Sequence, residues 1–264
     1  KVIHRERIDT ESVKGYDHIM AQVGRLIDSV SEKLGFRPDQ IGFATPGVLD
    51  PASQTMKNCN TTSMNGQPMA KDLARVVGCE VRLANDANCF ALAETLLGAV
   101  QDVNPKAQIV FGIIMGTGVG GGLVVHGQVV NGFHGIGGEW GHNILEDGGD
   151  PCYCGKSGCV EKVISGPALE LFYERQTGQK KKLKEIVQAY QDHSDPAADL
   201  TVRRLMDQFG RAVSTLINVI DPDVIVVGGG VGNIDLLYTE GYECIKKYIF
   251  NSDRKSTRLN SSHT

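Results

Sequence analysis

The sequence lacks any apolar run long enough to cross a membrane, and its longest purely apolar runs, such as residues 224–227, have only the length of a strand. It also lacks an excess of positive charge, because 27 Lys and Arg residues stand against 31 Asp and Glu residues, a net charge of −4. General attraction to nucleic acid or to anionic lipid is therefore not expected. No repeat of a fixed period is visible. These absences favour a soluble globular protein.

A disulfide framework is not indicated either, since the seven cysteines are odd in number and scattered along 264 residues. A reducing cytoplasm fits this usage. Apolar residues make up 41% of the chain and charged residues 22%, which is near the average for globular proteins and sufficient for a sizeable core. The length allows two modest domains or one large one.

Apolar periodicity predicts alternating helices and strands. Helices are expected at residues 13–34, 69–77, 86–97, 167–176, 182–190, 196–220 and 234–249, and strands at residues 41–44, 81–84, 109–115, 123–126, 129–131 and 224–227. The polar stretch 101–108 contains Pro105 and predicts a boundary between two lobes, a smaller one at residues 1–106 and a larger one at residues 107–253. Residues 254–264 lack apolar periodicity, so we expect a non-native appendage or a mobile native tail that does not pack.

Glycines gather at two places that follow predicted strands. At residues 116, 118, 120, 121 and 122 the backbone can approach an anion and direct several N–H groups at it, so phosphate is the natural ligand, although a tight β-turn explains the pattern almost as well. The segment is neither a Rossmann fingerprint nor a P-loop. Glycines 228–230 would let a nucleotide lie across the backbone, and close helix packing is an equally good explanation.

Asp86 follows a predicted strand and begins a predicted helix, within Asn85-Asp86-Ala87-Asn88. The positive end of the helix favours an ionised carboxylate there. Such a carboxylate can deprotonate a hydroxyl nucleophile during phosphoryl transfer. An ordinary helix N-cap is the simpler interpretation of this tetrapeptide alone.

Three cysteines and one histidine, His142, Cys152, Cys154 and Cys159, predict a structural zinc site in a glycine-rich loop. Four metal bonds would order a loop that has little core of its own. Free core cysteines are the alternative, and neighbouring acidic residues argue against a zinc-ribbon reader of nucleic acid. Glu139, His142 and Glu161 bracket this loop and suit the recognition of several sugar hydroxyls, unless the carboxylates are merely solvated.

Together these segments resemble ROK-type sugar kinases. Glu139-Trp140-Gly141-His142, followed by Cys152-Tyr153-Cys154-Gly155-Lys156-Ser157-Gly158-Cys159-Val160-Glu161, resembles the combined sugar and zinc signature of that family. The segment around Asp86 is similar to the one that holds the family's catalytic Asp, residues 116–118 to its second phosphate loop, and residues 228–230 to its adenosine motif. The resemblance extends over about residues 1–251 and implies an α/β protein of the actin-like, hexokinase-like (ribonuclease H-like) ATPase fold, with two lobes and a cleft between them.

The resemblance also implies an activity, transfer of the ATP γ-phosphoryl group to a hexose hydroxyl with Asp86 as the base and with ATP, Mg²⁺ and structural Zn²⁺ as cofactors. The sugar would be held by Asn60, Asn85, Glu139, His142 and Glu161, and the nucleotide by Gly116, Thr117, Gly118, Gly120, Gly228, Gly229 and Gly230. Residues 57–62, 65–68 and 151–156 look most like bacterial fructokinases of the manno(fructo)kinase type, with N-acetylglucosamine kinases and glucokinases next. Fructose is therefore the expected substrate.

Two departures from the family's pattern lead us to expect a fragment truncated at both ends. The family opens with a hairpin that carries an Asp-x-Gly-Gly-Thr phosphate loop, and this sequence starts some residues after the place of that hairpin. The family's last segment is replaced here by residues 254–264. We expect little activity and poor solubility of this chain alone. A ROK transcriptional repressor and a sugar-binding module without catalysis remain alternatives, and a homodimer is left open.

Overall fold

The computed structural model describes residues 2–250 and 258–262, and it forms two compact units. Unit 1 comprises Lys1–Asp86 with Gly132–Ile136, and unit 2 comprises Ala87–Asn131 with Gly137–Thr264. The division falls between Asp86 and Ala87, whereas the sequence predicts a lobe boundary after residue 106. It falls earlier because the two helices that follow Asp86 pack on the sheet of unit 2.

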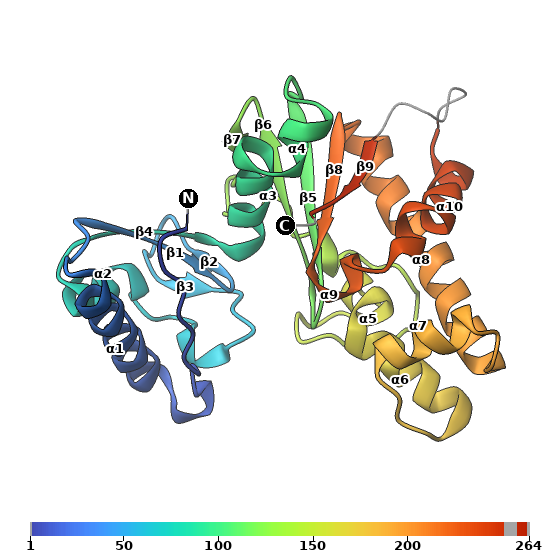
Figure 1. The fold of residues 1–264 in the computed structure, drawn as a ribbon, viewed down its shortest axis with the longest axis horizontal. Coiled ribbons are helices and arrows are strands. Elements are labelled where there is room, and N and C mark those ends of the chain that lie inside the picture. The colour runs from blue at the N-terminus through green and yellow to red at the C-terminus, as the bar shows by residue number, and fades with distance from the viewer. Residues whose placement is uncertain (1, 251–257, 263–264) are drawn as a thin grey trace. The chain divides into compact units, whose positions relative to one another are not determined.

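Unit 1 contains helices α1 (Tyr16–Leu34) and α2 (Met69–Val77) and two small sheets (Figure 1). Strand β1 (Gln40–Thr45) pairs in parallel with β4 (Glu80–Asn85), and β2 (Val48–Leu49) pairs antiparallel with β3 (Met56–Lys57). Short 3₁₀ turns occur at Ser12–Lys14 and Thr62–Met64. The buried core of this unit consists of Ile19, Met20, Met56, Cys59, Met64, Met69 and Leu73.

The centre of unit 2 is a five-stranded sheet with the order β7-β6-β5-β8-β9. The strands are β5 (Ile109–Met115), β6 (Val119–Val125), β7 (Gln128–Val129), β8 (Val224–Gly228) and β9 (Arg258–Ser261). Strand β5 pairs antiparallel with β6 and parallel with β8, so β5 and β8 have their carboxyl ends at the same edge. Both strands are apolar at nearly every position, as expected for a sheet covered on both faces.

Helices cover both faces of this sheet (Figure 1). On one face, α3 (Asp86–Leu97) and α4 (Ala99–Val103) pack on alternate residues such as Val110 and Val226. On the other face, α8 (Pro196–Ile220) packs on Phe111, Ile113 and Ile225. The remaining helices of unit 2 are α5 (Val160–Ile164), α6 (Gly166–Thr177), α7 (Leu183–Gln191), α9 (Gly229–Gly232) and α10 (Glu240–Tyr248), with 3₁₀ turns at Trp140–His142 and Asp235–Tyr238.

The structure corrects several expectations from the sequence. Residues 120–122 lie inside β6 rather than in a glycine-rich turn, because a turn of only three residues, 116–118, joins β5 to β6. The predicted helix at residues 234–249 is a 3₁₀ turn followed by α10. The tail expected not to pack contains β9, which pairs in parallel with β8 through residues 258–261, while residues 254–257 and 263–264 lie outside the described residues.

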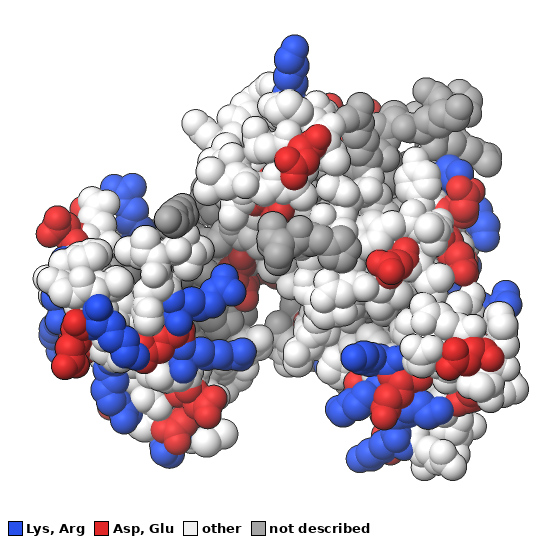
Figure 2. All heavy atoms as spheres, viewed as in Figure 1, with Lys and Arg blue, Asp and Glu red and all other residues white. Residues whose placement is uncertain are grey.

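Two general expectations can be compared with the structure. Among the described residues, none of the helices is both long and apolar enough to cross a membrane. Acidic and basic side chains are interspersed over the surface seen in Figure 2, as the nearly balanced composition predicts.

Candidate active site

Asp86 is the first residue of α3 and directly follows β4. Its side chain is exposed, and its position in the first turn of the helix favours the ionised carboxylate. The preceding residue, Asn85, donates a hydrogen bond of 3.2 Å from Nδ2 to the carbonyl oxygen of Gly47. Gly47 has φ +75° and lacks room for a Cβ, which would lie 2.5 Å from the Lys57 carbonyl oxygen. The carboxyl ends of β1 and β4 are thereby fixed together.

Asn60 lies in unit 1, in the loop that follows β3, and its side chain is exposed. The buried residue before it, Cys59, donates its backbone N–H to Asn65 Oδ1 over 2.9 Å and accepts from Asn65 Nδ2 over 3.2 Å. This pair of bonds holds the backbone from which Asn60 projects. Asn60, Asn85 and Asp86 thus belong to unit 1, and the other residues predicted for the site belong to unit 2.

The two predicted nucleotide turns lie next to each other at the carboxyl ends of β5 and β8. A Cβ added to Gly116 would lie 3.8 Å from the backbone nitrogen of Gly230. Gly229 has φ +85°, and a Cβ there would lie 2.3 Å from the carbonyl oxygen of Met115, so only glycine fits. Gly116 also accepts a 2.9 Å hydrogen bond from the backbone N–H of Gly166, at the start of α6. Both turns and a helix N-terminus therefore meet at one edge of the sheet.

A cavity of about 820 Å³ opens at this edge, entirely within unit 2. Its lining consists of Gly116, Thr117, Gly166, Pro167, Glu170, Lys182, Leu183, Lys184, Val187, Gln188, Gln191, Gly230, Val231, Asn233, Ile234 and Asp235. The lining combines an apolar wall, two lysines and several polar groups. Glu170 accepts from Lys182 Nζ over 3.1 Å and from the Leu183 backbone N–H over 3.0 Å. An apolar wall, cations and a helix N-terminus are what a nucleotide needs for its base and its phosphates.

Other predicted nucleotide glycines serve close packing in this structure. Gly120 lies in β6, where an added Cβ would be 3.2 Å from Ala87 Cβ, and Gly228 lies against the Phe90 ring. A Cβ on Gly118 would lie 2.7 Å from a carboxylate oxygen of Glu161. None of these three glycines lines the cavity. A nucleotide-binding role for them stays a prediction, while packing is observed.

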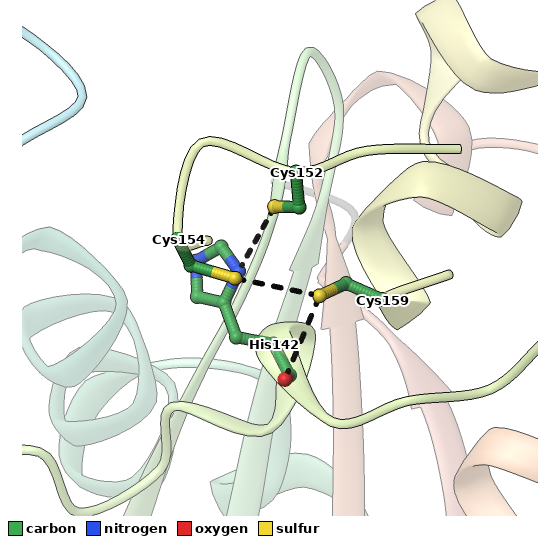
Figure 3. A group of neighbouring side chains, drawn as sticks. All are labelled: His142, Cys152, Cys154 and Cys159. Atoms are coloured by element: carbon green, nitrogen blue, oxygen red, sulfur yellow. Dashed lines mark hydrogen bonds between the residues drawn. The ribbon is translucent and has the colours of Figure 1, made fainter. Parts of the chain in front are cut away.

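The four predicted metal ligands converge on one point (Figure 3). One ligand atom from each of His142, Cys152, Cys154 and Cys159 lies within 4.8 Å of all the others. Cys152 Sγ is 3.5 Å from His142 Nδ1, and Cys154 Sγ is 3.5 Å from Cys159 Sγ. Ligands of a tetrahedral zinc ion lie about 3.5 to 3.8 Å apart, given its usual bond lengths. The donor set and the spacing both fit a structural zinc ion.

The electrostatics of the cluster also favour a cation. Burial, followed by the neighbouring thiols, raises the pKa of Cys159 to about 12, and burial raises the pKa of Cys152 as well. The pKa of the exposed Cys154 is lowered instead, with a hydrogen bond from the Lys156 backbone among the causes that lower it. Adjacent thiolates repel one another, and a bound cation would compensate their charge. Two isolated antiparallel β-bridges hold the backbone around the cluster. One joins Ile144 to Cys159, and the other joins Pro151 to Ser157.

Glu139 and Glu161 lie on either side of this metal loop in the sequence, and both side chains are half-buried. Glu161, in the first turn of α5, accepts a hydrogen bond of 3.2 Å from the backbone N–H of Val119. Next to Glu139, Trp140 donates its indole N–H to the carbonyl oxygen of Gly120 over 3.1 Å. Both carboxylates are therefore carried by segments that are anchored on β6.

The imidazole of His142 has partners on both nitrogens. Its Nδ1 faces the thiols, and its Nε2 lies 3.0 Å from the hydroxyl of Tyr153. Burial, together with the charges of Glu161 and Glu139, raises the pKa of Tyr153 well above its ordinary value. The geometry of His142 matches the metal role, and the sugar-binding role predicted for the same residue stays a prediction.

A family profile described as ROK family matches residues 1–263. The chain belongs to the ROK family. An N-acetyl-D-glucosamine kinase of Vibrio atlanticus (strain LGP32) is 35% identical over 98% of this chain and 88% of its own length. The predicted resemblance to ROK-type sugar kinases is thus confirmed at the level of the family.

Solved structures confirm the predicted α/β fold of ROK hexokinases. The ROK hexokinase of Thermus thermophilus matches 97% of this chain and 84% of its own chain, with a TM-score of 0.81 and 30% identity. A ROK glucokinase of Streptomyces griseus, solved in complex with glucose and AMPPNP, matches 94% of this chain and 83% of its own, with a TM-score of 0.79 and 24% identity. The second likeness is one of fold alone.

Sequence reasoning missed several residues that the structure brings to the candidate site. Lys182, Lys184 and Glu170 line the cavity, whereas the sequence predicts only that they belong to helices. The signal available was the start of α6, where Ser165 caps the helix and Pro167 occupies its first turn. Tyr153 belongs to the zinc signature in the sequence, and its contact with His142 cannot be deduced from spacing.

Proposed function

We propose that the protein is an ATP-dependent kinase that transfers the γ-phosphoryl group to a hydroxyl of N-acetyl-D-glucosamine. The proposed binding of ATP rests on the cavity at the carboxyl ends of β5 and β8. Two glycine turns and the N-terminus of α6 line this cavity. The sugar half rests on curated relatives that are 31% to 35% identical and are N-acetyl-D-glucosamine kinases. In the reaction, the sugar oxygen bonds to the γ-phosphorus while the bond to the bridging oxygen of ADP breaks.

Each part of this chain has a proposed role. Asp86 accepts the proton of the attacking hydroxyl, and its helix-start position favours the charged form that can do so. Backbone N–H groups around Gly116 and Gly230 hold the phosphates, and the apolar wall holds the base. Mg²⁺ would neutralise charge on the phosphates during transfer. The zinc ligands fix the loop between Glu139 and Glu161, whose carboxylates accept from sugar hydroxyls.

Fructose is the second candidate substrate. Residues 57–62, 65–68 and 151–156 resemble bacterial fructokinases of the manno(fructo)kinase type, and this resemblance predicts fructose as the substrate. The relatives favour the N-acetyl sugar instead. Fructose is a ketose and N-acetylglucosamine is an aldose, so the position of the anomeric carbon differs between them. N-acetylglucosamine also carries an acetamido group at its second carbon, and the carbonyl oxygen of that group needs a hydrogen-bond donor.

A coupled assay of ADP formation tests the proposal with N-acetylglucosamine, N-acetylmannosamine, glucose and fructose as acceptors. We expect kcat/KM for N-acetylglucosamine to exceed that for each other sugar by about tenfold or more, because unmatched polar groups are costly in a closed site. A higher value for fructose would overturn the substrate. Absence of ADP formation with every sugar, both in this chain and in a variant that carries the family's opening Asp-x-Gly-Gly-Thr hairpin, would overturn the kinase activity.

Substitution of Gly230 tests the nucleotide cavity. A Cβ at this position meets no other atom within 4 Å, so Gly230→Leu can fit the fold while its side chain fills part of the cavity. We expect affinity for an ATP analogue to fall about tenfold or more, measured by calorimetry. The matched control is Gly42→Leu, which also has open space around its Cβ and lies in β1 of unit 1. Equal affinity in both variants would place the nucleotide elsewhere.

A further inference from the structure

The side chain of Glu161 reaches from α5 to the turn at residues 116–118, which joins β5 to β6. Its Oε2 accepts a hydrogen bond of 3.2 Å from the backbone N–H of Val119, the buried residue that follows the turn. The same oxygen lies so close to Gly118 that a Cβ added there would be 2.7 Å away from it. The carboxylate therefore packs against the end of a turn that lines the nucleotide cavity.

This contact closes a ring of hydrogen bonds between the turn and the N-terminus of α6. Within the turn, the N–H of Gly116 donates to the carbonyl oxygen of Gly118 over 2.9 Å. The carbonyl oxygen of Gly116 accepts from the N–H of Gly166, at the start of α6, over 2.9 Å. Ser165, which caps α6, donates its backbone N–H to the carbonyl oxygen of Glu161 over 3.3 Å. Glu161 thus holds the turn with its side chain and the start of α6 with its backbone.

We propose that Glu161 is a positioning residue for the nucleotide, which fixes the turn at residues 116–118 relative to the N-terminus of α6. This inference rests on the proposed function. Both parts line the cavity, through Gly116 and Thr117 on one side and Gly166 on the other. Phosphates need N–H donors at a fixed spacing, and a misplacement of about 1 Å can cost on the order of a hundredfold in rate. The bond to the turn uses one carboxylate oxygen, so the predicted contact of Glu161 with a sugar would fall to the other.

Two substitutions of Glu161 test the inference. Glu161→Ala removes the carboxylate, and Glu161→Gln keeps an oxygen that can accept from the N–H of Val119. We expect Kd for the ATP analogue AMPPNP, measured with Mg²⁺ and without sugar by calorimetry, to rise about tenfold in Glu161→Ala. The rise in Glu161→Gln should stay below about threefold. The zinc content should be unchanged in both variants, because Glu161 lies outside the set of four metal ligands.

The matched control is Glu94→Ala, which removes the same kind of contact at another place in unit 2. Glu94, in α3, accepts with Oε2 from the backbone N–H of Ala99 over 2.9 Å, and a Cβ on Gly98 would clash with that oxygen. Glu94 lies outside the lining of the cavity. Kd for AMPPNP should therefore be unchanged in Glu94→Ala. An equal rise in Glu94→Ala and Glu161→Ala would overturn the inference, because a general loss of stability would explain both.

Gly118→Ala tests the same contact without altering Glu161. The φ angle of Gly118 is not positive, so its backbone accepts alanine, while the new Cβ would displace the carboxylate oxygen. We expect this substitution to raise Kd for AMPPNP about tenfold in the unaltered protein and less than about twofold in the Glu161→Ala background. A direct clash of the Cβ with the nucleotide would give the same rise in both backgrounds and would overturn the inference.

Failure of this inference can be distinguished from failure of the proposed function. Binding of AMPPNP requires no turnover, so a lack of ADP formation would refute the proposed function while the Kd values still decide the role of Glu161. Equal Kd values for Glu161→Ala and the unaltered protein would overturn the inference and leave the kinase activity unaffected. Absence of AMPPNP binding, both in this chain and in the variant with the opening hairpin, would overturn both.

Discussion

Asp86 allows the sharpest test at the scale of single residues, because it combines a helix-start position with an exposed carboxylate. Asp86→Asn keeps the size of the side chain and its capacity to cap the helix, since Asn and Asp cap about equally well. It removes the proton acceptor. We expect kcat to fall by about two orders of magnitude or more, with sugar affinity nearly unchanged. Steady-state kinetics and calorimetry measure the two effects separately.

The matched control is Asp102→Asn, which changes an exposed carboxylate in the first turn of the neighbouring helix α4. Its turnover should equal that of the unaltered protein. Turnover of Asp86→Asn within about threefold of this control would show that Asp86 only caps α3, the simpler interpretation of the sequence.

The glycines show how far single residues could be interpreted from the sequence. Gly116 and Gly230 line the cavity, as a nucleotide-binding interpretation requires. Gly120 and Gly228 lack a side chain because Ala87 and Phe90 of α3 press against them. The sequence allows both explanations, nucleotide binding and close packing. No neighbouring residue distinguishes the glycines that line the cavity from those that pack against α3. The difference arises from helix packing on the sheet, which depends on contacts distant along the chain.

The metal loop is an element whose order should depend on its ion. Cys154→Ser replaces an exposed ligand, so the variant loses a metal bond without opening a hole in the core. We expect the zinc content to fall from about one ion per chain to near zero. A chelator should lower Tm of the unaltered protein and leave Tm of Cys154→Ser unchanged, because binding energy of the metal is part of the folding energy. Elemental analysis and calorimetry measure both quantities.

Cys244→Ser provides the control for this element, since Cys244 lies in α10 outside the cluster and is half-buried. It should keep its zinc and its response to the chelator. A full complement of zinc in Cys154→Ser would contradict the assignment of the four ligands.

The N-terminus of α8 should make the stability depend on pH through Asp195. Asp195 Oδ2 accepts from the Tyr173 hydroxyl over 2.6 Å and from Lys181 Nζ over 2.8 Å, and Oδ1 accepts from the backbone N–H of Ala197 over 2.9 Å. These bonds, led by the one from Lys181, hold the pKa of Asp195 well below its usual range. Because the folded pKa is depressed, this stabilisation is fully present above the unfolded pKa and is lost as pH falls through the folded pKa.

Asp195→Asn should therefore destabilise the protein by about 1 to 2 kcal/mol at pH 7, since Asn caps the helix but carries no charge for Lys181. The gap in Tm between the variant and the unaltered protein should begin to narrow near pH 4, close to the pKa of an unfolded Asp. Calorimetry at pH 7, 5, 4 and 3 measures it. The control is Asp192→Asn, a substitution of an exposed residue just before this helix. Its Tm should not differ comparably from that of the unaltered protein. A gap that is constant over the whole range would exclude the charge as its cause.

Strong local signals predicted some elements to the residue. The predicted range for α8 agrees with the structure because Asp195 caps it, Pro196 begins it and a continuous apolar face follows. The short helices α4 and α5 were not predicted, since five residues carry too little periodicity to detect. In β6 the glycines at 120–122 suggested a turn, although tight packing of α3 makes them strand residues.

At the scale of the whole molecule, the metal set could be predicted from the sequence and the cavity could not. The four metal ligands lie within eighteen residues, counted from His142 to Cys159, so spacing alone brings them together. The lining of the cavity comes from separate segments near residues 116, 166, 182 and 230. The parallel pairing of β5 with β8 brings the segments near 116 and 230 together, and hydrogen bonds to Gly116 and Glu170 add the segments near 166 and 182. A contact of this kind spans more than a hundred residues and leaves no local pattern.

Each of the two units has its own core. A ligand that binds unit 2 should therefore change the local stability of unit 2 and leave that of unit 1 unchanged. The core of unit 1 includes Ile19 and Leu73, while the metal loop and the cavity both belong to unit 2. In hydrogen exchange, an ATP analogue should slow exchange around residues 116–118, 166–170 and 229–235, because a ligand stabilises what it binds by about 2.7 kcal/mol at a hundredfold excess over Kd. A chelator should speed exchange around residues 143–164. Neither should alter α1 or α2, and equal changes there would mean that the units unfold as one.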